Sequence, residues 1–341
     1  RVLRDGAEEV RAWISLHSLA TYVDSINPEV WFIGSSRVER GIDVSIFESL
    51  LRRDGYDWSV VNLAVPGGGI ETSLGVVRHF ASRAARPRLI VYPIAAFELN
   101  ESFPSPVLAR YFMTQTDFVY HLSETIWDKG LDLTSRYYLS NIRYSLLEAW
   151  DLPTMKDARE AMLHLPQRKW RVALERMRIV SPRGTTWQDL VDELVRPAKP
   201  LDLQVLLQSL PLRADPTLAD YRVGDQKRKN FSRLLHFCRT EGIELVFVNT
   251  PVSSWQQSAL RGMPAERFTA FMQEASAESN FIWMPITEEA LEITDADFIG
   301  VRKGKEFLDP DHLNWQGAQK YSTSLYRNVV APLLALQQGV D

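Results

Sequence analysis

The chain has 341 residues, of which 45% are hydrophobic and 24% are charged, and it contains 18 prolines and one cysteine. A chain of this composition can bury a substantial core, which excludes intrinsic disorder, a fibrous repeat and a disulfide scaffold. Its 39 lysine and arginine residues are outnumbered by 43 aspartate and glutamate residues, which gives a formal net charge of -4. Binding to a phosphate backbone usually requires a basic excess, so we expect no nucleic-acid partner.

The hydropathy of the chain predicts no transmembrane segment. The longest apolar runs, residues 89–97 and 329–336, each contain a proline and fall well short of the roughly 18 residues that span a bilayer. The chain begins at Arg1 rather than at methionine, and we interpret it as a truncated or processed chain. Its single cysteine, Cys238, cannot form a disulfide within the chain. This is compatible with the cytosol and equally with a cysteine-poor exported domain.

The first hundred residues alternate between short apolar runs and helical stripes. Residues 6–24 place apolar side chains three or four positions apart, which predicts an amphipathic helix. Apolar runs bounded by turn residues are typical of buried parallel strands, and we expect a sharp loop at residues 34–36 after the first of them. The predicted strands cover 29–33, 58–63 and 89–94, and the predicted helices between them include 46–51 and 74–80.

The pattern changes after residue 100, where long aromatic-rich segments of helical character predict an insertion over residues 101–228. The alternation of strands and helices then resumes, and Asn314 is the expected N-cap of the last helix. Residues 1–100 and 229–341 together predict an α/β domain with a doubly wound, parallel, five-stranded sheet of the flavodoxin-like kind. The later strands are predicted at 243–248 and 281–284, and the later helices at 229–239, at 268–277 and from 315 onward.

A serine follows the first predicted strand, in the tripeptide Gly34-Ser35-Ser36. Open α/β sheets bind their ligands at the carboxyl ends of parallel strands, so Ser36 is well placed to be a nucleophile. The alternative is that Ser35 and Ser36 are loop residues that only satisfy backbone groups before the next helix. Position by itself leaves both interpretations open.

A histidine near the end of the chain follows an aspartate by three positions, within residues 309–315. On a tight loop, the Asp309 carboxylate can fold back to accept the Nδ1 proton of His312. Nε2 is then left to take a proton from a serine hydroxyl. Asp311 fits that role less well, since adjacent side chains usually point in different directions. The alternative is an ordinary turn in which both aspartates cap the backbone and His312 is partly exposed.

Two further elements could stabilise an oxyanion. The glycines at 67–69 follow the second predicted strand, and they could present an amide N–H to an oxyanion, cradle a phosphate or make a tight turn. The phosphate interpretation lacks the spacing of the known phosphate loops, and no lysine follows the glycines. Asn100, after the third predicted strand, could donate its side-chain amide to an oxyanion or cap a helix.

Taken in chain order, these motifs resemble those of the SGNH hydrolase superfamily, also called GDSL-type esterases, over residues 28–100 and 229–335. The family's G-D-S block reads Gly34-Ser35-Ser36 here, with Ser35 in place of the usual aspartate. Its second block matches residues 62–67, and its D-x-x-H block is matched in full at residues 309–312. The family's third block, G-x-N-D, is matched only poorly in this sequence. The resemblance implies a triad of Ser36, His312 and Asp309, with oxyanion donors at Ser36 and Gly67 and with Asn100 as the candidate third donor.

Within the superfamily, the start, the long insertion and the ending of this sequence are similar to those of extracytoplasmic members that work beside membrane-bound O-acyltransferases. Examples are the D-alanyl transfer protein of teichoic acid synthesis and the alginate O-acetylation proteins. This resemblance implies ester hydrolysis or O-acyl transfer on an acylated carbohydrate or polymer of the cell envelope, with a membrane-bound O-acyltransferase as partner. It also implies an export signal or an anchor before Arg1, although the single cysteine equally allows a cytoplasmic location.

Arg37 and Arg40 follow the candidate nucleophile closely and could bind an anionic group of the substrate. The alternative is that they form ion pairs with Glu39, Asp43 or Glu48. The remaining histidines show no metal-ligand spacing and one cysteine cannot build a thiolate site, so we expect no metal and no cofactor. Two rival functions stay open: a non-catalytic carbohydrate-binding or accessory protein, and a nucleotide-binding protein that uses its glycine run as a phosphate loop.

Overall fold

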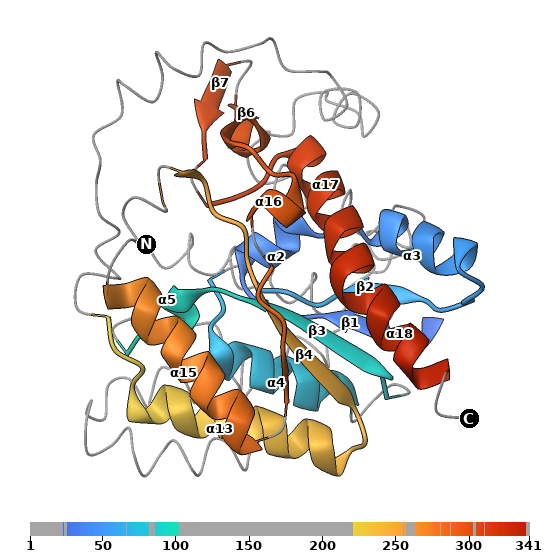
Figure 1. The fold of residues 1–341 in the computed structure, drawn as a ribbon, viewed down its shortest axis with the longest axis vertical. Helices are drawn as coiled ribbons and strands as arrows, with labels where there is room; N and C mark the ends of the chain where they lie inside the picture. The colour runs from blue at the N-terminus through green and yellow to red at the C-terminus, as the bar shows by residue number, and fades with distance from the viewer. Residues whose placement is uncertain are drawn as a thin grey trace, which may run out of the picture.

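The computed structural model describes the α/β part of the chain in detail (Figure 1). Apart from residue 23, the predicted helix over 6–24 lies outside the described residues, and so does most of the predicted insertion. Among the described residues, no helix combines the length and the apolar character needed to cross a bilayer. The described residues are 23, 26–65, 67–81, 86–101, 221–254, 256, 263–279, 281–286, 288–302, 305–309 and 311–338.

A parallel sheet of five strands, in the order β2-β1-β3-β4-β5, forms the centre of the domain and confirms the predicted fold class. Val30 of β1 pairs with Val60 of β2 on one side and with Leu89 of β3 on the other. In this flavodoxin-like order the direction of strand addition reverses between β1 and β3, and ligands bind beyond the carboxyl ends of the strands at that point. The strands are β1 (Val30–Phe32), β2 (Val60–Asn62), β3 (Leu89–Ile94), β4 (Glu244–Asn249) and β5 (Ile282–Trp283).

Helices cover both faces of this sheet (Figure 1). Because successive side chains of a strand point to opposite faces, Trp31 of β1 packs into one apolar layer, whereas Val30 and Phe32 pack into the other. The layer around Trp31 includes α4 (Ile70–Ala81), α13 (Asp225–Thr240) and α15 (Met263–Ser279). The layer around Phe32 includes α2 (Ser36–Gly41), α3 (Val44–Arg53), α16 (Glu288–Leu291), α17 (Trp315–Leu325), the π-helical η3 (Tyr326–Val330) and α18 (Ala331–Gln338).

Local signals in the sequence explain several helix boundaries. Asn314 is the N-cap of α17, as predicted, and its Oδ1 accepts a hydrogen bond from the backbone N–H of Gly317 at 2.9 Å. Asp43 caps α3 in the same way, since its side chain accepts from the backbone N–H of Ser45. Both caps satisfy backbone donors that have no partner within the first helical turn.

Several short elements of the described structure are absent from the sequence prediction. The sharp loop expected after β1 consists of Ile33, Gly34 and Ser35, because β1 ends at Phe32 and α2 begins at Ser36. Helix α5 (Ala96–Leu99) follows β3 almost directly, and β6 (Ile299–Arg302) and β7 (Lys305–Leu308) form an antiparallel hairpin outside the main sheet. Elements of four to six residues are too short to develop a hydrophobic period that distinguishes them from loops.

Candidate active site

Ser36 lies beyond the carboxyl end of β1, an inner strand of the sheet between β2 and β3, and it is the first residue of α2. The turn between them depends on Gly34, whose φ of +141° is a backbone conformation that residues with a side chain rarely adopt. A Cβ at this position would also lie 2.6 Å from Cγ2 of Val38. Glycine therefore allows the chain to turn from the strand into the helix so tightly that Ser36 stays at the edge of the sheet.

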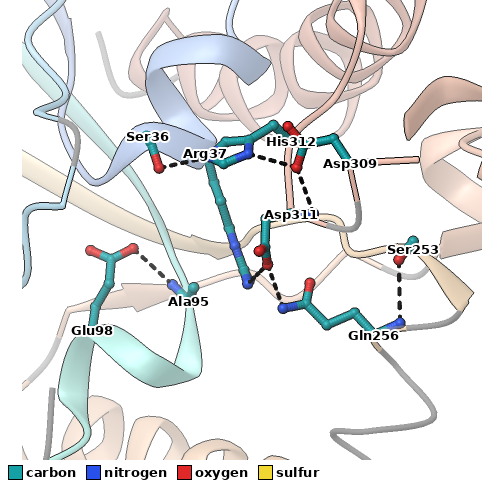
Figure 2. Close-up of polar contacts among 9 residues, drawn as sticks. All are labelled: Ser36, Arg37, Ala95, Glu98, Ser253, Gln256, Asp309, Asp311 and His312. Atoms are coloured by element: carbon teal, nitrogen blue, oxygen red, sulfur yellow. Dashed lines mark hydrogen bonds and ion pairs between the residues drawn. The ribbon is translucent and has the colours of Figure 1, made fainter. Parts of the chain in front are cut away.

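The side chains of Ser36, His312 and Asp309 form one hydrogen-bonded chain (Figure 2). His312 Nε2 lies 2.8 Å from Ser36 Oγ, and His312 Nδ1 lies 2.8 Å from Asp309 Oδ1. Residues 309–312, named here the D-x-x-H turn, thus fold back on themselves. They meet a serine that is 276 positions away in the sequence.

The surroundings of Asp309 favour its ionised form. Burial by itself would raise the pKa of Asp309, but the hydrogen bond with His312 and the charges of His312 and Arg40 outweigh burial and lower this pKa. A carboxylate that accepts a hydrogen bond from Nδ1–H selects the histidine tautomer in which Nε2 is free to accept a proton. The geometry is therefore suited to the removal of the Ser36 proton by His312.

The glycine-containing turn after β2 lies beside the turn that carries Ser36. The backbone N–H of Val65 donates to the carbonyl oxygen of Gly34 at 2.8 Å. Asn62 Nδ2 donates to the carbonyl oxygen of Val38 in α2 at 3.0 Å. These bonds hold the two backbone segments together. Gly67, the predicted oxyanion donor, is exposed in this turn and has a φ of +71°.

Asn100, the candidate third oxyanion donor, is the C-cap of α5 and is fully buried. Its Oδ1 accepts a hydrogen bond from the backbone N–H of Arg222 at 3.2 Å. The same segments also meet through a β-bridge between Asn100 and Val223 and through the hydrogen bond from Glu101 N to Arg222 O at 3.0 Å. Asn100 thus connects the segment after β3 with the segment that enters α13.

The two arginines after Ser36 both contact the D-x-x-H turn. Arg37 Nη2 lies 2.6 Å from Asp311 Oδ1, and Arg40 Nη1 lies 3.2 Å from Asp309 Oδ2. The guanidinium of Arg37 also lies over the ring of Phe97, with 4.6 Å between its central carbon and the ring centroid. Ion pairing was one of the two roles expected for these arginines, but their partners here are two aspartates from the far end of the chain.

Gln256 is a site residue that no sequence motif indicates. Its Nε2 donates to Asp311 Oδ1 at 2.5 Å, so Arg37 and Gln256 hold the same carboxylate oxygen (Figure 2). The only signal in the sequence is position, since Gln256 follows β4 at the carboxyl edge of the sheet. Asp311, which fits the triad role less well than Asp309 in the sequence, is thus the centre of a second group of polar contacts next to the triad.

Glu98 is the second residue that the motifs do not indicate. It is fully buried after β3, where its carboxylate accepts hydrogen bonds from the Tyr92 hydroxyl at 2.8 Å and from the Ala95 backbone N–H at 3.3 Å. Burial raises the pKa of Glu98 to about 7, against the opposing effects of these hydrogen bonds and of the Arg37 charge.

Within the described part of the chain, no three His, Cys, Asp or Glu side chains are grouped so that they could hold a metal ion.

No protein-family model matches the sequence, and the comparison with curated proteins finds no match. Among solved structures, the chain is similar to TesA, with 11% sequence identity, a TM-score of 0.40 and coverage of 88% of this chain and 97% of that chain. It is also similar to the psychrotrophic esterase EstA from Pseudoalteromonas sp., with 7% identity, a TM-score of 0.39 and coverage of 89% and 98%. The function proposed for the site therefore rests on its geometry and its motifs.

Proposed function

We propose that this chain is a serine esterase or O-acyltransferase of the SGNH hydrolase superfamily, in which Ser36, His312 and Asp309 form the catalytic triad. The observation that carries the proposal is the hydrogen-bonded chain from Ser36 Oγ through both ring nitrogens of His312 to Asp309, with 2.8 Å at each link. A serine, a histidine and an aspartate in this order activate a hydroxyl group for attack on a carbonyl carbon. The blocks at residues 34–36 and 309–312 support the same assignment.

In the proposed reaction, Ser36 Oγ attacks the ester carbonyl while Nε2 of His312 removes its proton. Asp309 holds the Nδ1–H of His312 and stabilises the imidazolium that forms. The tetrahedral intermediate collapses when His312 gives the proton to the departing alcohol oxygen, which leaves the acyl group on Ser36. Water or a second alcohol, deprotonated by His312, then attacks this acyl group and releases Ser36 for another cycle.

The backbone N–H groups of Ser36 and Gly67 are the proposed donors to the oxyanion of the intermediate. The hydrogen bonds that tie Val65 to Gly34 and Asn62 to Val38 support this assignment, because they hold the two donor segments side by side. Each oxyanion-hole donor typically contributes about 3 kcal/mol to stabilisation of the transition state. Asn100, which is fully buried and accepts a hydrogen bond from the Arg222 backbone N–H, is the candidate for a third donor from the poorly matched third block.

The proposed substrate is an acylated carbohydrate or polymer of the cell envelope, processed outside the cytoplasm beside a membrane-bound O-acyltransferase. This part of the proposal is supported by the resemblance of the sequence to extracytoplasmic members of the superfamily. Transfer to a sugar hydroxyl and hydrolysis by water share the same acyl-enzyme, so they differ only in the acceptor. Incubating the chain with an acetyl ester and an oligosaccharide, and measuring acetylated sugar against free acetate, decides between them.

The first test of the proposal is covalent labelling of the purified chain by a fluorophosphonate, with peptide mass spectrometry to locate the adduct. We expect labelling at Ser36 that is abolished in Ser36→Ala and in His312→Ala. Ser35→Ala is the matched control, since it removes the neighbouring hydroxyl and should keep the label. A folded protein that is not labelled would refute the proposed nucleophile. If it retained oligosaccharides in a binding assay, a non-catalytic carbohydrate-binding role would replace the esterase.

A further inference from the structure

Two arginines of the helix that carries the nucleophile contact the two aspartates of the D-x-x-H turn. Arg37 and Arg40 are three positions apart, so they lie on the same face of α2. Arg37 pairs with Asp311, and Arg40 pairs with Asp309. Helix α2 therefore carries both Ser36 and two charged contacts to the turn that presents the catalytic histidine.

The pair made by Arg37 is much more buried than the pair made by Arg40. The Arg37 side chain is 7% exposed and packs on the Phe97 ring, whereas the Arg40 side chain is 43% exposed. A guanidinium that has lost its hydration is tolerated only when a partner compensates its charge. Asp311 is that partner, so the position of Asp311 is strongly coupled to the position of Arg37.

A second buried group holds the same oxygen of Asp311 from another direction. Gln256 is 3% exposed, and its Nε2 donates to Asp311 Oδ1. The backbone N–H of Gln256 in turn donates to Ser253 Oγ at 3.2 Å, which links it to the segment after β4. The Asp311 side chain is itself 40% exposed. Asp311 is thus a partly exposed carboxylate whose orientation is set by two buried donors (Figure 2). Arg37 donates from α2, and Gln256 donates from the segment after β4.

The backbone beside Asp311 is anchored at its two ends. The N–H of Asp309 donates to Phe298 O at 2.9 Å, and the N–H of Asn314 donates to Asp297 O at 2.7 Å. Between these anchors, the turn meets α2 through the side chains of its aspartates. The distance from the histidine ring to the nucleophile is therefore set by side-chain contacts as well as by the backbone.

We propose that Arg37, Gln256 and Asp311 are positioning residues, which hold the His312 ring against Ser36. Asp311 directly precedes His312, so a carboxylate that is fixed by two buried donors also fixes the backbone from which the ring projects. A displacement of about 1 Å in a catalytic group can cost on the order of 100-fold in rate. This inference rests on the proposed function and extends it to residues outside the triad. The competing role for Arg37 is to bind an anionic group of the substrate.

The test compares Asp311→Asn, Gln256→Leu and Arg37→Met in the full chain. The substrates are neutral 4-nitrophenyl acetate and the anionic mono-4-nitrophenyl succinate, and the rate of fluorophosphonate labelling is measured in parallel. If these residues position the histidine, kcat for both esters and the labelling rate fall by the same factor, about 10- to 100-fold, while KM changes by less than about twofold. Arg37→Lys should recover part of kcat, because it restores a positive charge beside Asp311.

The matched control is Arg52→Met, which removes an exposed ion pair with Glu48 within α3 and should leave kcat and KM unchanged. The outcome that overturns the inference is a rise in KM for the succinate ester alone in Arg37→Met, with the labelling rate of wild type. That result would assign Arg37 to substrate binding.

A spectroscopic measurement distinguishes failure of this inference from failure of the proposed function. The Nδ1–H of His312, hydrogen-bonded to Asp309, should give a downfield proton resonance that is absent from His312→Ala. The inference predicts that this resonance shifts in Asp311→Asn, because the ring is no longer held against Ser36 at Nε2, while the melting temperature stays close to that of wild type. A resonance that persists unchanged in Asp311→Asn overturns the inference, whether or not the protein hydrolyses esters. A wild-type chain that is neither labelled nor active, but whose resonance shifts in Asp311→Asn, refutes the proposed function and keeps the positioning role.

Discussion

Replacing Glu98 by glutamine should remove a pH dependence of folding stability that originates in one buried carboxylate. Glu98 has no exposed surface, and its two oxygens face the Tyr92 hydroxyl and the Ala95 backbone N–H. Tyr92 also meets Ser73, whose Oγ lies 2.9 Å from the tyrosine oxygen. Glutamine can reproduce the protonated acid in this network. Its Oε1 accepts from Ala95, and its Nε2 donates to Tyr92, whose proton turns toward Ser73.

The size of the effect follows from the pKa of Glu98. Burial raises this pKa from the ordinary value of 4.5 to about 7 in the folded chain. Since one pKa unit corresponds to about 1.4 kcal/mol, the shift represents about 3 kcal/mol of folding stability. Between these two pKa values the folded protein holds a proton that the unfolded chain has released, so stability falls as the pH rises. The contribution is complete below pH 4.5 and is lost above about pH 7.

Urea denaturation of wild type and Glu98→Gln between pH 4 and pH 8 measures this effect. Relative to wild type, the free energy of unfolding of the variant should rise by about 3 kcal/mol from pH 4 to pH 8, because glutamine cannot ionise. Glu289→Gln, at an exposed position of α16, controls for the loss of one negative charge. Curves for wild type and Glu98→Gln that run parallel over the whole range would refute the reasoning, since they would mean that folding leaves the pKa of Glu98 unchanged.

Three further substitutions test the packing that supports the site. Gly34→Ala places a Cβ 2.6 Å from Val38 Cγ2 at a positive φ, so urea denaturation should show a loss of about 2 kcal/mol or more; an unchanged midpoint would contradict the strained turn. Asn62→Ala removes the hydrogen bond to the Val38 carbonyl and should slow fluorophosphonate labelling. Labelling at the wild-type rate would mean that this bond does not help to hold the oxyanion donors in place. Lys227→Met leaves the Glu71 carboxylate, 2.8 Å from Lys227 Nζ, without that buried cation. It should cost about 3 to 5 kcal/mol, and calorimetry should show Glu71→Gln recovering part of this loss.

The strands of the sheet were predictable because parallel strands buried on both faces appear as short apolar runs between turn residues. The runs at 89–94 and 243–248 became β3 and β4 with boundaries within one residue of the prediction. The cap at Asn314 was predictable for a similar reason, since the group that it satisfies lies three positions away. The contact between Asp309 and His312 also spans three positions. Each of these features depends on near neighbours in the chain.

Short elements were not predictable on the same basis. Helix α2 has six residues, too few for a hydrophobic stripe, yet its first residue is the candidate nucleophile. Burial of a polar side chain is a second property that the local sequence does not show. Glu98 would be expected on the surface by residue type, and only the packing of the segment after β3 makes it a buried carboxylate with a raised pKa.

By itself, the sequence determined the fold class and the residue types that the candidate site contains. It could not determine which polar groups meet beside the triad, because Arg37 and Asp311 are 274 positions apart and Gln256 is 55 positions from Asp311. Spacing predicts contacts within one turn or one helix, whereas contacts between distant segments depend on how whole elements pack. The packing of α2 and of the segment after β4 against the D-x-x-H turn therefore decided the partner of Arg37. From the sequence alone, Arg37 could be expected either to bind an anionic group of the substrate or to form an ion pair with a nearby acidic residue.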